Sequence, residues 1–126
     1  MFRGKRIDNG EWIIGNLINS PDGRIAISET SGDWKLHECI PTTICQCTGL
    51  KDKNGKLIFE NGIMEARLDE DYPEDVTRER VLWYGSGWYT KEQGSIDYAQ
   101  LDDCDSEWYE VIGNTVDNPE LLEEQE

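Results

Sequence analysis

The sequence has no apolar stretch of about 18 residues, and no basic segment near its start is followed by an apolar one. A transmembrane helix needs roughly 20 consecutive apolar residues, and a secretory signal peptide needs a basic segment followed by an apolar core. We therefore expect neither feature, and with them absent we expect a cytoplasmic location. Cysteines in that compartment stay reduced, so free thiols are expected at Cys39, Cys45, Cys47 and Cys104.

Histidine is scarce, since His37 is the single one in the chain. Its sequence neighbourhood contains no Ser-His or Cys-His signature of nucleophilic catalysis. The segment Gly85-Ser86-Gly87 lacks the Lys-Ser/Thr pair that completes a phosphate-binding loop. The acidic segment 69–75 lacks the alternating ligands, central Gly and distal Glu of a calcium-binding loop. The sequence therefore predicts no catalytic residue, no cofactor and no enzymatic activity.

Positive charge is missing from the last third of the chain. Residues 92–126 contain twelve Asp and Glu and no Lys or Arg, whereas residues 1–56 are almost balanced, and the whole chain has a formal net charge of −15. Nucleic-acid binding depends on cations that neutralise phosphates, so nucleic acid is a disfavoured partner. Acidity of this kind gives solubility, and it would also suit a basic protein partner.

Aromatic rings and turn residues are abundant: five Trp, five Tyr, two Phe and twelve Gly. Short β-rich runs recur between Gly, Asn and Pro turns at intervals of roughly ten residues, a spacing typical of sandwiches and barrels. The chain is therefore predicted to be mainly β, with a small barrel-like or complex all-β fold. Asn118, Pro119 and Glu120 have the residue types that begin a helix, which predicts a short C-terminal helical turn.

Several segments carry more specific predictions. Asn54-Gly55 is typical of a tight hairpin turn in which both central residues have positive φ. Gly15 is a candidate β-bulge within the strand predicted at 12–18. The acidic segment 69–80 is predicted to be a loop. An aromatic hairpin is predicted at 81–90, and a final strand at 108–114.

One set of side chains has the composition of a metal site: His37, Cys39, Cys45 and Cys47. Zinc prefers four Cys or His ligands, and alternate residues of a strand share one face, so two antiparallel strands could bring these four together. However, the Cys-x-Cys spacing differs from the Cys-x₂₋₄-Cys of a zinc knuckle. We favour packed structural cysteines without metal, and keep the set as a weak metal candidate only.

The start of the chain combines rings with cations at Phe2, Arg3, Lys5, Arg6 and Trp12. Such a set can stack on and neutralise single-stranded nucleic acid. Because the net charge of the chain opposes that ligand, a role in the core or in a subunit contact is favoured.

Three segments carry a resemblance to a known family. They are Phe2–Arg6 with Gly10-Glu11-Trp12, the central run Thr48–Glu60, and Val111–Asn114 followed by 117–121. In these motifs the chain resembles the YopX family of small phage and prophage proteins. Relatives usually continue the central run with Tyr-Glu-Gly-Asp-Ile-Val, whereas this chain has Gly62 in place of the aspartate.

The resemblance implies a mostly β protein with a barrel-like body, encoded by a phage or prophage and located in the bacterial host cell. It implies a single domain over residues 1–126, with a subdivision into an N-terminal β part, 1–48, and a barrel-like C-terminal part, 49–126, left open. It brings no catalytic residue with it.

Two functions remain. The favoured one is a non-enzymatic protein that acts through protein contacts, including contacts with its own copies, because a thin core often recruits partner surface. The alternative is a DNA mimic whose acidic face inhibits a host nucleic-acid enzyme.

Overall fold

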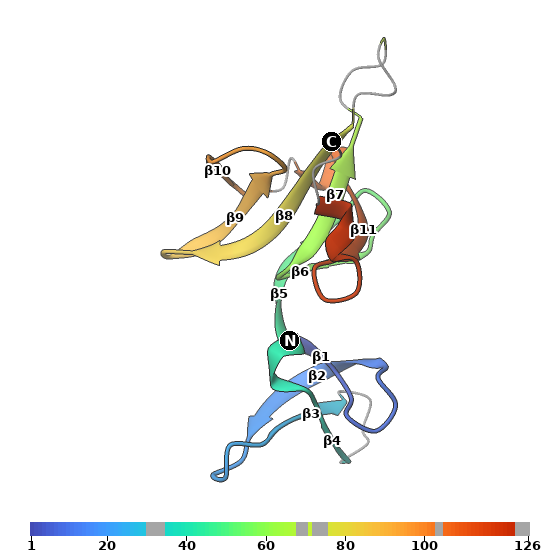
Figure 1. The fold of residues 1–126 in the computed structure, drawn as a ribbon, viewed down its shortest axis with the longest axis vertical. Helices are drawn as coiled ribbons and strands as arrows, with labels where there is room; N and C mark the ends of the chain where they lie inside the picture. The colour runs from blue at the N-terminus through green and yellow to red at the C-terminus, as the bar shows by residue number, and fades with distance from the viewer. Residues whose placement is uncertain (30–34, 68–70, 72–75, 103–104, 123–126) are drawn as a thin grey trace. The chain divides into compact units, whose positions relative to one another are not determined.

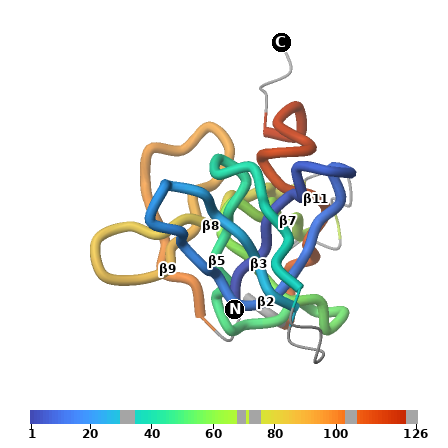
Figure 2. The backbone as a smooth tube through the Cα atoms, turned by 90° about the horizontal axis from the view of Figure 1, so that it is seen from below, coloured from blue at the N-terminus to red at the C-terminus, as the bar shows by residue number. Residues whose placement is uncertain are grey.

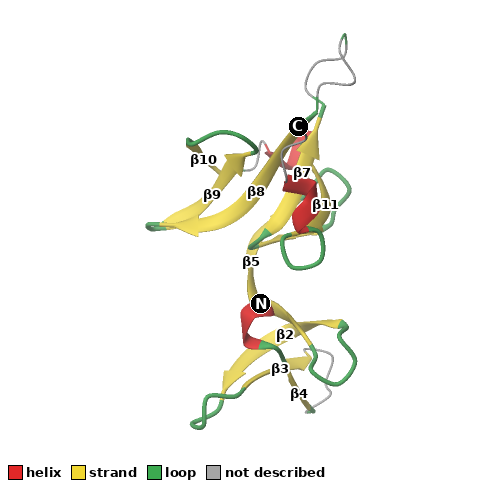
Figure 3. Ribbon diagram, viewed as in Figure 1, coloured by secondary structure: helices red, strands yellow, loops and turns green. Residues whose placement is uncertain are grey.

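The computed structural model describes the chain except residues 30–34, 68–70, 72–75, 103–104 and 123–126. The chain divides into two compact units, Met1–Cys47 (unit 1) and Thr48–Glu126 (unit 2). The subdivision considered from the sequence lies after residue 48, next to this boundary. Strands dominate both units, and the helical segments are short (Figure 3). The prediction of a mainly β chain is confirmed.

Unit 1 is an antiparallel sheet in the order β4-β3-β2-β1-β5. Its strands are β1 (Phe2–Lys5), β2 (Trp12–Asn19), β3 (Ile25–Glu29), β4 (Leu36–Glu38) and β5 (Cys45–Lys51), with the 3₁₀ turn η1 (Pro41–Thr43) before β5. Strands β2 and β3 lie side by side (Figure 2) and pair antiparallel from Gly15 opposite Glu29 to Asn19 opposite Ile25. An isolated bridge between Arg6 and Cys39 also ties the end of β1 to the residue after β4.

The core of unit 1 is small. It consists of buried Ile13, Ile27 and Cys39, with Phe2, Leu17 and Ile44 packed around them. Gly15 lies in regular register opposite Phe2 and Glu29, so the predicted bulge is wrong. A Cβ at Gly15 would overlap the Ser28 carbonyl oxygen. The glycine is therefore required by the close approach of β2 and β3 rather than by a bulge.

Unit 2 contains an open antiparallel sheet in the order β10-β9-β8-β7-β11 (Figure 1). The strands are β7 (Gly62–Ala66), β8 (Thr77–Tyr84), β9 (Gly87–Glu92), β10 (Tyr98–Gln100) and β11 (Glu110–Asn114). Strand β6 (Leu57–Phe59) lies beside β5, and a one-turn helix α1 (Asp105–Trp108) precedes β11. The buried core residues are Ile58, Met64, Ala66, Val81, Leu101 and Tyr109.

The turn between β5 and β6 is built around the buried carboxylate of Asp52. Its Oδ1 accepts hydrogen bonds from the backbone N–H groups of Asn54 (2.9 Å) and Lys56 (2.8 Å), and its Oδ2 accepts one from Val111 in β11 (2.9 Å). Gly55 has φ +80°, but Asn54 does not have positive φ, since Asn61 is the one such non-glycine residue described. The predicted turn type is wrong because Asp52 closes a longer turn.

A second polar centre closes the end of β11. The Asn114 side chain is buried, and its Oδ1 accepts hydrogen bonds from the backbone N–H groups of Val116 (3.0 Å) and Asp117 (2.8 Å). The Asn118 side chain accepts one from the Asn114 N–H at 3.3 Å. The 3₁₀ turn η2 (Pro119–Leu122) follows, so the predicted C-terminal helical turn is confirmed.

Two further predictions need correction. The loop predicted over 69–80 ends earlier, because Thr77–Arg80 belong to β8, where their alternating side chains pair with β7; residues 68–70 and 72–75 lie outside the described part. The last strand starts at Glu110, because Trp108 ends α1. Among the described residues the sheet of unit 2 stays open, with β10 and β11 as its edges.

Candidate functional site

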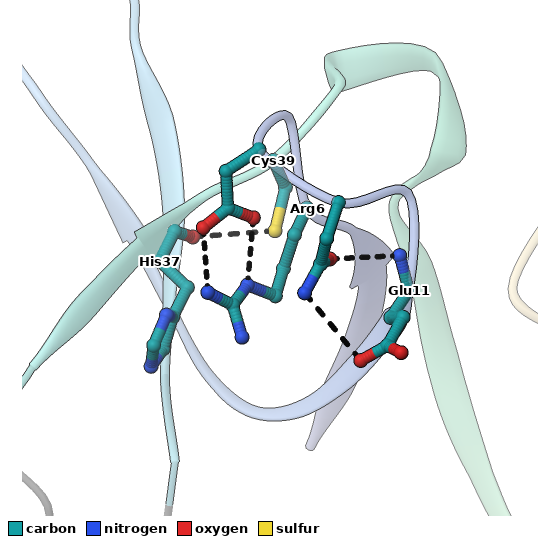
Figure 4. A network of polar contacts seen from close by, with 6 residues as sticks. Arg6, Glu11, His37 and Cys39 are labelled. Carbon is teal, nitrogen blue, oxygen red and sulfur yellow. Dashed lines mark hydrogen bonds and ion pairs between the residues drawn. The ribbon is translucent and has the colours of Figure 1, made fainter.

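The candidate metal set belongs to unit 1, and within the described residues its four side chains do not form one cluster. His37 is opposite buried Ile27 in the β3–β4 register, and Cys39 is buried beside that pair, its Sγ donating to the His37 carbonyl at 3.3 Å (Figure 4). Cys45 is also buried, and its Sγ donates to the Thr43 carbonyl at 3.3 Å. Cys47 is partly exposed. Within the described ranges, no group of three or more His, Cys, Asp or Glu side chains is placed to hold a metal ion.

Burial also governs the chemistry of the Cys39 thiol. It raises the pKa of the Cys39 thiol above its usual value, because the apolar surroundings disfavour the thiolate. The thiolate is the reactive and metal-binding form of cysteine. Cys39 therefore acts as an apolar core residue of unit 1.

The ring and cation set at the start of the chain is only partly assembled. Arg3 and Lys5 both lie over the ring of Trp12, at 4.6 Å and 5.5 Å from its centroid. Phe2, in contrast, packs against the core of unit 1. Arg6 forms a bidentate ion pair with Asp8, and this hydrogen bond lowers the pKa of the Asp8 carboxyl (Figure 4).

The more extensive surface lies on the hairpin of β8 and β9 together with β10. Because side chains alternate across a strand, the register divides these strands into two faces. One face, here called the tyrosine face, carries Arg78, Arg80, Leu82, Tyr84, Tyr89, Lys91, Tyr98 and Gln100. The other, here called the tryptophan face, carries Thr77, Glu79, Val81, Trp83, Trp88, Thr90, Glu92 and Ala99.

The rings on the tyrosine face are in contact. Tyr84 and Tyr98 are stacked, with centroids 4.7 Å apart and an angle of 9° between the planes. Tyr89 meets Tyr84 edge to face at 6.0 Å. Tyr84 is 55% exposed and Tyr98 is 42% exposed. The pairwise contacts therefore fix the ring positions while leaving much of two rings in solvent.

The cations on the tyrosine face differ in their partners. Arg78 is held by Glu65 of β7, with its Nε 3.0 Å from Glu65 Oε2, and it donates to the Leu121 carbonyl. Arg80 donates to the neutral side-chain oxygen of Asn61 at 3.0 Å. Arg80 and Lys91 lie directly opposite each other in the register.

Among the residues that the structure describes, this pair of cations has no carboxylate partner. Over the described ranges, neither Arg80 nor Lys91 has a carboxylate within ion-pair distance. The strands β8, β9 and β10 place no Asp or Glu on the tyrosine face. The tyrosine face thus combines uncompensated positive charge with stacked rings.

The tryptophan face is different in both packing and charge. Trp88 packs against the core of unit 2, and Trp83, 50% exposed, meets it edge to face at 5.0 Å. Glu79 and Glu92 lie opposite each other in the register, and the Tyr109 hydroxyl donates to Glu79 at 3.1 Å. The two faces of one hairpin therefore present opposite charges.

Unit 2 also has a hollow beside helix α1, with a volume of about 380 Å³. Its lining is mostly charged and includes the exposed ring of Trp108. The charges are largely paired with each other, since Lys53 lies 3.9 Å from Glu110, and Arg67 lies 4.0 Å from Glu65. It is a weaker candidate than the tyrosine face.

Sequence reasoning identified the aromatic hairpin at 81–90 as a structural element but did not recognise its face as a site. The signal was the alternation of residue types along the two strands of the hairpin. Arg80, Leu82 and Tyr84 alternate before the turn, and Tyr89 and Lys91 alternate after it. Pairing around Gly85-Ser86 brings the two series onto one face. Only the position of Tyr98 on this face could not be inferred without the tertiary structure.

Comparisons with known proteins place the chain in a family. A family model described as YopX protein matches residues 1–123 of the chain. No curated protein matches the sequence. In the part of the chain that the structure describes, no helix has the length and apolar character needed to cross a membrane.

Proposed function

The chain belongs to the YopX family, and from this premise we propose that it is a phage- or prophage-encoded protein that binds another protein in the cytoplasm of the bacterial host. Its action is non-enzymatic and consists of occupying a surface of that partner. The acidic composition of the chain keeps it soluble until it meets the partner.

The observation that carries this proposal is the stacked pair of exposed rings on the tyrosine face, Tyr84 of β8 and Tyr98 of β10. Tyr84 and Tyr98 are each at least 42% exposed, Trp83 on the opposite face of the hairpin is 50% exposed, and Ile96, two residues before β10, is 87% exposed. Tyr and Trp are enriched in protein interfaces, where they supply large contact area at low entropic cost. Exposed rings that lie together on one face of a sheet are a typical feature of an interaction surface.

The residues of the family motifs support the same proposal, because they are used to build the fold. Asp52 of the central run binds three backbone N–H groups of unit 2. Asn114 and Asn118 of the final motif close the end of β11. The motifs therefore indicate a fold that members of the family share. The exposed residues of the hairpin remain available for the contact between this chain and its partner.

Self-association belongs to the same proposal. Unit 1 exposes aliphatic side chains that include Ile7, Ile14 and Leu36, and it contains five Lys and Arg against six Asp and Glu. A nearly neutral unit can approach its own copy without strong repulsion. Light scattering should give a mass above that of the 14.5 kDa monomer. A monomer at high concentration would rule out this part of the proposal.

A DNA-mimicking inhibitor is the second candidate function. Unit 2 contains 21 Asp and Glu against seven Lys and Arg, a surplus that suits the cationic site of a nucleic-acid enzyme. Exposed rings have no part in such mimicry, because contacts to phosphate-binding sites depend on charge. The two functions therefore differ in which residues they require.

An affinity pull-down from bacterial host lysate, at low and high salt, tests the proposal. We compare the wild-type chain, the double variant Tyr84→Ser/Tyr98→Ser, and Ile18→Ser, a control with one exposed apolar residue of unit 1 removed. A protein partner should be retained at high salt, lost with the double variant and kept by the control.

The opposite pattern supports DNA mimicry. Exposed charge contacts are screened by salt, so basic nucleic-acid-binding proteins would then be released at high salt and would bind the double variant normally. A pull-down in which the double variant retains every wild-type partner contradicts the proposed contact surface.

A further inference from the structure

We propose that the tyrosine face binds an acidic segment of a partner protein, with carboxylates meeting Arg80 and Lys91 and apolar or planar side chains covering Tyr84 and Tyr98. This inference rests on the proposed function, and it adds the chemistry of the partner. It is unexpected for a chain with a net charge of −15, because the overall charge favours a basic partner.

The distribution of charge within unit 2 is the first step. Acids outnumber Lys and Arg by 21 to seven in this unit, yet the tyrosine face of β8, β9 and β10 contains three of the seven cations and no acid. The acids of the hairpin, Glu79 and Glu92, are both on the tryptophan face. This separation of cations from acids follows from their alternation along each strand, because successive side chains point to opposite faces of the sheet.

The register of the two remaining cations is the second step. Arg78 is neutralised by Glu65 at 3.0 Å, whereas Arg80 and Lys91 lie opposite each other. Like charges directly opposite in a sheet destabilise it. An external carboxylate between them would relieve this repulsion and gain charge-assisted hydrogen bonds. The bond from Arg80 to Asn61 Oδ1 holds the guanidinium in place without using its charge.

The rings are the third step. Tyr84 and Tyr98 form one stacked unit next to Lys91, because Tyr98 pairs with Lys91 across β9 and β10. Stacked rings lose little conformational freedom when a partner covers them, and their hydroxyl groups can donate to carboxylates. Rings and cations within one face match a segment in which acidic and apolar residues alternate.

Charge also decides between an acidic protein segment and a nucleic acid. A nucleic acid carries a phosphate at every residue, and it would meet the field of a unit with a large excess of carboxylates. A short segment with a few carboxylates makes its contacts within the Debye length of about 8 Å around Arg80 and Lys91. The acidic protein segment is therefore the occupant that the face fits.

The test uses the full ¹⁵N-labelled chain and two synthetic peptides of equal length, in which Phe and Tyr alternate with either Glu or Lys. A single-stranded oligothymidylate is the third probe. The Glu peptide should shift the backbone amide signals of β8, β9 and β10. The double variant Arg80→Gln/Lys91→Gln should weaken its affinity about tenfold, while Lys56→Gln, which removes an exposed cation elsewhere in unit 2, should leave it unchanged.

Three results would overturn the inference: the Lys peptide binding at least as tightly as the Glu peptide, the oligothymidylate binding to this face in preference to the Glu peptide, or no shift in β8, β9 and β10. The same amide spectra show whether each variant is folded. Failure here is distinct from failure of the proposed function. A pull-down partner lost with Tyr84→Ser/Tyr98→Ser but kept with Arg80→Gln/Lys91→Gln would uphold the protein contact and reject its acidic chemistry.

Discussion

Single side chains in this protein have clearly structural roles, and Asp52 is the best example. It is 4% exposed, and its two carboxylate oxygens accept three backbone hydrogen bonds. A buried carboxylate is tolerated only when it is satisfied in this way. Sequence reasoning located the turn from Asn54-Gly55 but could not find this role, because Val111 lies 59 residues further on.

Asp52→Asn should therefore destabilise the protein by about 2 kcal/mol, since the change removes a charged acceptor and places an amide N–H₂ against a backbone donor. Urea unfolding of both proteins measures the difference. The matched control is Asp97→Asn, an exposed aspartate of the same unit, for which a change within about 0.5 kcal/mol is expected. Equal losses for the two variants would contradict the role of Asp52.

The cysteines should differ in their rates of alkylation. Cys47 is partly exposed, whereas Cys39 and Cys45 are buried and burial raises the pKa of the Cys39 thiol. Below its raised pKa the thiol stays protonated, and alkylation requires the thiolate. With iodoacetamide at neutral pH, peptide mass spectrometry should find Cys47 modified before Cys39 and Cys45. Urea should remove the difference, and early modification of Cys39 in the folded protein would refute it.

At the scale of elements, the sequence predicted strands and turns well wherever Gly, Asn or Pro separated β-rich runs. The pair β8–β9 and the turn η2 follow from local residue types alone. The errors came from tertiary contacts. Gly15 is needed for the approach of Ser28. Thr77–Arg80 are polar and charged residues that become a strand only because β7 is beside them.

The strand pair β2–β3 gives a direct test of this explanation. Gly15→Ala should cost about 2 kcal/mol or more, because the new methyl group would overlap the Ser28 carbonyl and force the strands apart. Gly87→Ala is the control, since its methyl group would meet only the Tyr89 ring at 3.6 Å, an ordinary contact. Thermal unfolding compares them. A bulge at Gly15 would instead tolerate alanine, so an unchanged midpoint for Gly15→Ala would contradict regular pairing.

At the scale of the whole molecule, charge is divided unequally between the units. Unit 1 is close to neutral, with five Lys and Arg against six Asp and Glu, whereas unit 2 has seven against 21. Composition revealed this asymmetry from the sequence alone. The tyrosine face did not follow from composition, because net charge averages over both faces of a hairpin and hides their difference.

Repulsion within unit 2 predicts that salt stabilises the protein. Raising sodium chloride from about 20 mM to about 500 mM shortens the Debye length several-fold, which weakens self-repulsion in the folded state. Calorimetry should therefore show a higher midpoint temperature for the transition of unit 2. An uncharged osmolyte of equal osmolality serves as the control. A midpoint that falls with added salt would show that attractive ion pairs outweigh the excess of acids.

The hydrogen bond from Val111 to Asp52 also sets an order of events during synthesis. The β5–β6 turn leaves the ribosome long before β11. Until β11 has been synthesised, Asp52 Oδ2 cannot accept its hydrogen bond from Val111, and β7 lacks its neighbouring strand at the sheet edge. Unit 1 has no such delay, because it lies within the first 47 residues of the chain. Polysomes should therefore carry nascent chains in which unit 1 is folded and unit 2 is incompletely folded, because its final strand has not yet been synthesised.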